Sequence, residues 1–185
     1  MNILIACEYS GRVREAFRAR GHNVLSCDLE PSDLDGPHYR GDVRHVLNLV
    51  PWDMLIGFPP CTWLSLATTW RWHRPESADH MRAAVEFFLL LWRQPIPRIA
   101  LENPPGWINS HVMRASQTVQ PWWFGEDYTK RTSLWLKNLP PLMATCPTIP
   151  QRHTYIVNMA PGPQRAKLRS LTPPGLARAM AEQWG

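Results

Sequence analysis

Short apolar runs alternate with helical patterns along the first hundred residues, and this alternation constrains the fold more than any other feature. Strands of a parallel sheet are buried on both faces, so they read as short continuous apolar runs. Such runs predict strands at 2–7, 23–27, 53–57 and 98–101, with helices at 12–20 and 77–92 between them. Strand–helix–strand order predicts an α/β fold with a mostly parallel sheet and right-handed crossovers.

Local signals mark the ends of these helices. Ser10 is placed to cap the first helix and Gly21 to end it, and Ser77 is a candidate cap for the second. One face of the second helix carries Met81, Val85, Phe88 and Trp92. The rest of the chain predicts a short helix at 43–49, a polar turn-rich segment at 31–41, a loop at 62–74, a strand at 132–136, irregular structure at 140–163 and a last helix at 173–183.

The length of 185 residues and a hydrophobic content of 44% predict a single domain with a sizeable core. The longest apolar cluster, 85–92, is too short to span a bilayer, and the amino terminus lacks the pattern of a signal peptide. We therefore expect a cytoplasmic protein with no membrane partner. The four cysteines form no C-x-x-C pair, so no metal site is expected.

A net charge of +5 suits a polyanionic partner. The run Trp70-Arg71-Trp72-His73-Arg74 interleaves aromatic and basic side chains. Such a run either stacks on bases and meets phosphates, or is a surface loop anchored by tryptophan packing.

Polar residues gather where the expected strands end. This group consists of Glu8, Asp28, Asp42, Cys61 and Glu102. Ligands of open α/β sheets bind at the carboxyl ends of the strands, so the five predict a shared cleft. Each residue alone has a plainer interpretation as a turn-forming acid or a helix cap.

Two of these residues suggest covalent chemistry. Cys61 would be a nucleophile if a cation or a helix end lowers its pKa. Glu102 would be an acid whose pKa is raised in a dry pocket, or alternatively a solvated or ion-paired loop residue.

Two others suggest a nucleoside cofactor. Asp28 lies about twenty residues after the first turn, the spacing at which an acid meets ribose hydroxyls. The turn Glu8-Tyr9-Ser10-Gly11 holds one glycine, which fits a cofactor without a pyrophosphate. Asp42 would accept a hydrogen bond from an adenine amino group.

Four segments, in order, resemble motifs of the DNA cytosine-5 methyltransferase family. They are Phe58-Pro59-Pro60-Cys61, Leu101-Glu102-Asn103-Pro104, Tyr128-Thr129-Lys130-Arg131-Thr132 and Arg169-Ser170-Leu171-Thr172-Pro173 followed by Ala177-Arg178. The resemblance implies a Rossmann-like S-adenosylmethionine-dependent fold, DNA as partner, and a bacterial or phage-infected cell. It also implies base flipping, attack of Cys61 on carbon 6 of cytosine, protonation of ring nitrogen 3 by Glu102, and methylation of carbon 5.

The same resemblance assigns the remaining site residues. Asn103 would brace the loop, and Lys130 or Arg131, with Thr132, would contact the base or the DNA backbone. The cofactor pocket would be lined by Glu8, Tyr9, Ser10, Gly11, Asp28, Asp42 and Pro60.

The chain departs from the family in its size. Residues 137–168 form a much reduced recognition insert where the family has a separate domain, as in compact prophage-type relatives. A short or relaxed target sequence is expected, read by loops 63–74 and 147–165, with a homodimer or a second subunit as the other source of recognition surface.

Two rival functions remain. An exocyclic-amine methyltransferase needs Asp, Asn or Ser before Pro-Pro, where this chain has Phe58. A catalytically silent nucleic-acid-binding protein would have no need of Cys61 and Glu102.

Overall fold

The computed structural model describes residues 1–146, 148, 151–156, 158–160, 162 and 164–185. In this part of the chain one sheet has the strand order β3-β2-β1-β4-β5-β7-β6. Its strands are β1 (Asn2–Ala6), β2 (Asn23–Asp28), β3 (His38–Arg40), β4 (Met54–Gly57), β5 (Arg98–Asn103), β6 (Gln117–Val119) and β7 (Thr132–Lys137). Strands β1 to β5 pair in parallel, and β7 is antiparallel to both β5 and β6. The expected α/β fold with a mostly parallel sheet is confirmed.

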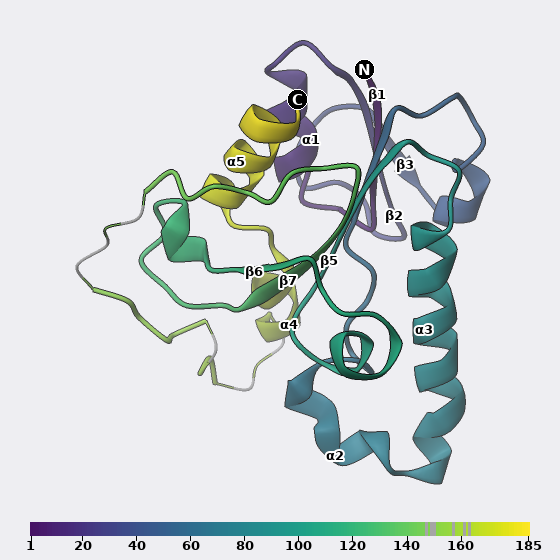
Figure 1. The fold of residues 1–185 in the computed structure, drawn as a ribbon, viewed down its shortest axis with the longest axis vertical. Coiled ribbons are helices and arrows are strands. Elements are labelled where there is room, and N and C mark those ends of the chain that lie inside the picture. The colour runs from purple at the N-terminus through teal and green to yellow at the C-terminus, as the bar shows by residue number, and fades with distance from the viewer. Residues whose placement is uncertain (147, 149–150, 157, 161, 163) are drawn as a thin grey trace.

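Helices cover both faces of this sheet (Figure 1). They are α1 (Arg12–Arg18), α2 (Thr69–Trp72), α3 (Ala78–Trp92), α4 (Arg165–Ser170) and α5 (Pro174–Trp184). Helices α1 and α5 lie on one side and α3 on the other. None of the helices among the described residues is long and apolar enough to cross a bilayer.

Alternation along β1 shows how the two cores form. Ile3 and Ile5 are fully buried in the cluster that includes residues of α1 and α5. Leu4 and Ala6 belong to the opposite cluster, which includes Phe88 of α3. Because successive side chains of a strand point to opposite faces, one continuous apolar run supplies both layers.

Most elements lie within two residues of the predicted bounds, and the differences are local. β3 lies in the polar segment 31–41, α2 in the expected loop 62–74, and the segment 43–49 holds a 3₁₀ turn, Val43–His45. β6 and α4 are further elements that the apolar pattern does not predict. The described residues of 140–163 contain no helix or strand. Residues 147, 149–150, 157, 161 and 163 of the expected recognition loop 147–165 lie outside the described residues.

The helix caps also differ in detail from the prediction. Gly11, not Ser10, occupies the N-cap position of α1, although the Ser10 hydroxyl accepts a 3.3 Å hydrogen bond from the Arg12 amide. Ser77 occupies the N-cap position of α3 but makes no side-chain cap bond. Packing against the sheet rather than capping therefore holds α3 in place.

Candidate active site

Cys61 and Glu102 lie at the carboxyl ends of two neighbouring strands: Glu102 is the penultimate residue of β5, and Cys61 lies in the loop after β4. β4 and β5 are parallel partners with Gly57 opposite Leu101. Glu102 comes directly after Leu101, and Cys61 lies four residues after Gly57. The carboxylate of Glu102 raises the pKa of the Cys61 thiol, so the two groups lie within electrostatic reach of each other.

The pKa of the Cys61 thiol is raised, contrary to the lowering that an activated nucleophile suggests. Burial is the main cause and Glu102 the second. Lys130 and Arg169 lower the pKa but do not outweigh these two effects. Burial and Glu102 therefore favour the thiol form of Cys61, and Lys130 and Arg169 are its neighbouring cations.

Burial also raises the pKa of the Glu102 carboxyl. Lys130 and the nearby Thr132 oppose the shift without cancelling it. Glu102 lines a narrow cavity of about 10 Å³ with Phe58, Lys130, Ser170, Thr172, Pro173 and Leu176. The motif-like segment 169–173 therefore lies close to Glu102, at the carboxyl ends of the strands.

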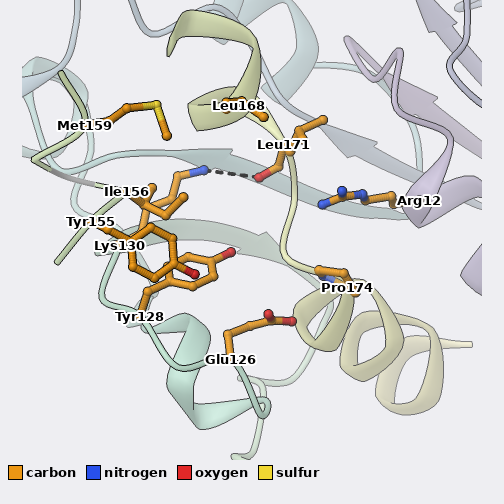
Figure 2. A pocket seen from close by; sticks show the side chains of 10 residues that line it. All are labelled: Arg12, Glu126, Tyr128, Lys130, Tyr155, Ile156, Met159, Leu168, Leu171 and Pro174. Carbon is orange, nitrogen blue, oxygen red and sulfur yellow. Dashed lines mark hydrogen bonds between the residues drawn. The ribbon is translucent and has the colours of Figure 1, made fainter. Parts of the chain in front are cut away.

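The two basic residues Lys130 and Arg131 have different surroundings. Lys130 lines the cavity beside Glu102, and its Nζ lies 3.4 Å from the carbonyl oxygen of Leu171 (Figure 2). Arg131 is exposed. Thr132 is buried, and its hydroxyl donates to the Lys130 carbonyl at 3.2 Å.

Asn103 joins the two strand ends. Its side chain is buried, and Nδ2 donates to the carbonyl oxygens of Pro59 at 2.7 Å and of Glu102 at 3.0 Å. The remaining atom, Oδ1, is buried without a hydrogen-bond partner among the described residues. The loop that carries Cys61 is therefore tied to the strand that carries Glu102.

Backbone hydrogen bonds also join the loop after β4 to the loop after β5. The Leu64 amide donates to Cys61 O at 3.0 Å, the Trp107 amide to Leu64 O at 2.7 Å, and the Leu66 amide to Pro105 O at 3.1 Å. A Cβ atom on Gly106 would lie 1.9 Å from the Leu64 carbonyl oxygen, so this close approach requires glycine. Sequence reasoning missed Gly106, although a glycine directly after Pro104-Pro105 was a visible signal.

The acids expected to hold a cofactor lie around Cys7. Asp28 ends β2, Asp42 follows β3, and both carboxylates raise the pKa of the Cys7 thiol. Asp28 is half buried and accepts a 3.0 Å hydrogen bond from the Glu30 amide. Asp42 binds the amide of Arg44 at 2.9 Å and its guanidinium at 2.8 Å.

The first turn, 8–11, is occupied by internal contacts. The Glu8 carboxylate is buried and accepts hydrogen bonds from the Val13 amide and the Ser10 hydroxyl, each at 2.8 Å. Glu8 therefore caps α1, the plainer of its two interpretations. Gly11 has a φ of 71°, and a Cβ there would lie 2.7 Å from the guanidinium of Arg14.

The other expected cofactor residues lie near the surface. The Tyr9 hydroxyl donates to the Lys167 carbonyl of α4 at 3.1 Å and lies 3.0 Å from the Ser170 hydroxyl. Pro60 is exposed beside Cys61. The structure thus brings Cys61, Glu102, Asn103, Lys130 and Thr132 together, and groups Asp28 and Asp42 at the ends of neighbouring strands.

A cavity of about 380 Å³ opens beside Lys130 (Figure 2). It is lined by Arg12, Glu126, Tyr128, Lys130, Tyr155, Ile156, Met159, Leu168, Leu171 and Pro174. The rings of Tyr128 and Tyr155 lie 5.5 Å apart, and Glu126 accepts a 3.0 Å hydrogen bond from the Gly175 amide at the start of α5. Lys130 lines both cavities, which places a cation where they adjoin.

Within the described ranges, no cluster of three or more His, Cys, Asp or Glu side chains is arranged to hold a metal ion. No protein-family model matches the chain, and no curated protein matches it.

Comparison with solved structures finds distant matches. An E. coli prophage protein described as a DNA modification methyltransferase matches with a TM-score of 0.48 and 15% identity, over 74% of this chain and 46% of that protein. The bifunctional kinase-methyltransferase WbdD matches with a TM-score of 0.39 and 11% identity, over 77% of this chain and 36% of WbdD. The chain spans less than half of the length of either protein.

Proposed function

We propose that this protein transfers a methyl group from S-adenosyl-L-methionine to carbon 5 of cytosine in DNA. The observation that carries the proposal is the placement of Cys61 and Glu102 at adjacent strand ends, within electrostatic reach of each other and of Lys130. Carbon 5 chemistry needs both a sulfur nucleophile and a proton donor for the ring.

The charges of the site suggest how the nucleophile is formed. Each of Cys61 and Glu102 resists ionisation, and an ionised Glu102 makes a Cys61 thiolate less favourable. The pair therefore favours one negative charge over two. When the thiol proton passes to an ionised Glu102, the thiolate loses this repulsion and keeps Lys130 and Arg169 as neighbouring cations.

The proposed reaction then balances in three steps. The Cys61 sulfur forms a bond to carbon 6 of the flipped cytosine while Glu102 gives its proton to ring nitrogen 3, and the electron pair of the 5,6 double bond becomes available at carbon 5. Carbon 5 would then form a bond to the methyl group of S-adenosyl-L-methionine as the methyl–sulfur bond breaks, the sulfur keeping the electron pair, so that S-adenosyl-L-homocysteine leaves. The carbon 5 proton passes to solvent and its electron pair re-forms the 5,6 double bond, the carbon–sulfur bond breaks with its electron pair going to the Cys61 sulfur, and the nitrogen 3 proton returns to Glu102.

The acids at the ends of β2 and β3 fit the adenosine part of such a cofactor. S-adenosyl-L-methionine supplies an electrophilic methyl group when bound. Burial raises the pKa of Asp28, and hydrogen-bond donors such as ribose hydroxyls would stabilise its charge. Asp42 is suited to the adenine amino group, whereas the carboxylate of Glu8 is engaged by α1. We therefore assign Glu8 a supporting role, with Tyr9, Ser10, Gly11 and Pro60 forming the wall of the pocket.

The position of the added methyl group tests the proposal. DNA from an unmethylated source, both duplex and single-stranded, is incubated with a methyl donor labelled with ¹³C. It is then digested to nucleosides for mass spectrometry. We expect labelled 5-methylcytosine with the wild type and none with Cys61→Ala. Label on an exocyclic amine would favour the rival enzyme class. Donor binding without label in any nucleoside would favour a silent binding protein.

A further inference from the structure

Aromatic and cationic side chains form a continuous series of contacts in the segment after Cys61. We call this series the Trp–Arg ladder; it consists of Trp63, Trp70, Arg71, Arg74 and His80. The Arg71 guanidinium lies 4.9 Å from the Trp63 ring centre and 4.6 Å from that of Trp70. Arg74 lies 4.8 Å from the Trp70 ring, and Trp63 stacks on His80 of α3 at 4.5 Å with 10° between the planes.

The ladder presents apolar and cationic groups to solvent together. Trp70 is 56% exposed and the neighbouring Leu66 is 46% exposed. Arg71 has no carboxylate partner among the ion pairs of the described residues, and Arg74 has a long contact of 3.7 Å with Glu76. Aromatic rings and guanidinium planes are the groups on which unpaired bases stack, and arginine also meets phosphates.

The ladder is fastened to both loops of the candidate active site. It begins two residues after Cys61, and the amide of Leu64 donates to the Cys61 carbonyl at 3.0 Å. Trp72 packs edge-on against Trp107 at 5.2 Å, and Trp107 stacks on His111 at 3.8 Å beyond the end of β5. The ladder therefore lies next to the strand ends that carry Cys61 and Glu102.

We propose that the Trp–Arg ladder binds unpaired DNA, so that the protein acts on single-stranded or locally opened DNA. Base pairs inside a duplex have both faces covered by their neighbours, whereas an unpaired base can stack on Trp70. The inference deepens the proposed function and rests on it for the choice of target. Binding itself requires neither Cys61 nor a cytosine.

A cytosine-free binding assay tests the ladder separately from catalysis. Fluorescence anisotropy compares a labelled 20-mer of thymidine with the duplex that it forms with its adenine complement, over a range of salt concentrations. The wild type is expected to bind the single strand about tenfold or more tightly than the duplex. Trp70→Ala should weaken single-strand binding about tenfold, the order expected for one stacked base, and Trp70→Phe should restore most of it.

Charge variants provide the matched control. Arg74→Ala should weaken binding and reduce its salt dependence. Arg93→Ala removes the same charge from an exposed position just beyond the opposite end of α3, and should change affinity less than twofold. Circular dichroism and thermal unfolding of each variant establish that it folds.

Several results would overturn the ladder proposal. Equal affinity of the wild type for single strand and duplex would do so, as would a folded Trp70→Ala variant that binds like the wild type. A dimer that dissociates in Trp70→Ala with unchanged DNA binding would assign the surface to a second copy of this chain. Single-strand binding that depends on Trp70, with no 5-methylcytosine formed in the methyl transfer assay, would support the ladder proposal and contradict the proposed function.

Discussion

Cys61 and Glu102 each have a raised pKa, and burial is the main cause for both. For Glu102 the shift favours a protonated carboxyl, the form that donates to a ring nitrogen. For Cys61 the shift means that the thiolate forms only when its surroundings become less negative. The two residues thus make sense as a pair that shares a proton rather than as two independent groups.

Glu102→Gln should reduce turnover without removing the cofactor. Loss of a positioned general acid lowers rates by about 10²–10⁴. Glu102 lies beside Lys130 and Thr132 rather than beside Asp28, so the affinity for S-adenosylmethionine should change less than about threefold. Single-turnover kinetics and calorimetry measure the two quantities, and a comparable loss in both would point to a structural role.

The same substitution should also change the pH dependence of stability. A carboxyl whose pKa is raised by folding binds its proton more tightly in the folded state. Wild-type stability should therefore fall as the pH rises from the ordinary value of 4.5 through the raised one. Glu102→Gln removes this loss, so its free energy of unfolding should exceed that of the wild type at pH 8 and approach it near pH 4.

Urea unfolding at several pH values checks this, with Glu86→Gln on the exposed face of α3 as the control. A pH-independent difference between Glu102→Gln and the wild type would show that the carboxyl is not the titrating group.

The sequence predicts which residues of the candidate site lie together better than it predicts the surroundings of each one. Strand ends and motif order identified Cys61, Glu102 and Lys130, because parallel strands deliver their carboxyl ends to one edge. The sequence left Lys130 and Arg131 as equal candidates, and their different exposure became visible only in the fold. Glu8 is placed like a ligand in the sequence, yet its carboxylate turns to the amides of α1, a contact that no periodicity reveals.

At the scale of elements, the loops after β4 and β5 act as one unit. Asn103 binds the Pro59 carbonyl, and backbone bonds join 64–66 to 105–107. The geometry between Cys61 and Glu102 therefore depends on the packing of the two loops as well as on the strands.

Gly106→Ala should push the loops after β4 and β5 apart. The added Cβ would lie 1.9 Å from the Leu64 carbonyl oxygen, so the loops must move apart. We expect a loss of about 1–3 kcal/mol in the free energy of unfolding and a fall in methyl transfer of at least about tenfold.

Gly162→Ala is the control for this substitution, since a Cβ there meets no atom of the described residues within 4 Å, and it should change stability by less than about 0.5 kcal/mol. Denaturant unfolding and the methyl transfer assay measure both effects. Wild-type behaviour of Gly106→Ala would mean that the loops are not joined in this way.

Elements with a strong apolar period were predicted well, and short ones were not. β1, β4 and β5 are buried on both faces and stand out as apolar runs. β3 and β6 have three residues each, too few for a pattern, and they depend on pairing with β2 and β7. α4 follows a proline-rich segment, carries no buried residue and is held by contacts with Tyr9 and Asp33.

In the whole molecule, residues from both halves of the chain lie together at the carboxyl ends of β4 and β5. The segment up to the end of β5 supplies Cys61 and Glu102, and the later segment adds Lys130, just before β7, and Arg169 in α4. The ion pair of Lys167 with Asp33 at 2.7 Å joins α4 to the loop after β2. A chain of this size can therefore bring residues that are far apart in the sequence to one candidate active site, with the Trp–Arg ladder beside it.

Covalent trapping would show whether Cys61 attacks cytosine. DNA that contains 5-fluorocytosine, single-stranded and duplex, is incubated with the protein and S-adenosylmethionine, denatured and analysed by mass spectrometry. Fluorine cannot leave carbon 5 as a proton does, so we expect a stable protein–DNA adduct that maps to Cys61 and is absent in Cys61→Ala. A wild type that forms no adduct on DNA of varied sequence, or one that maps to another residue, would contradict it.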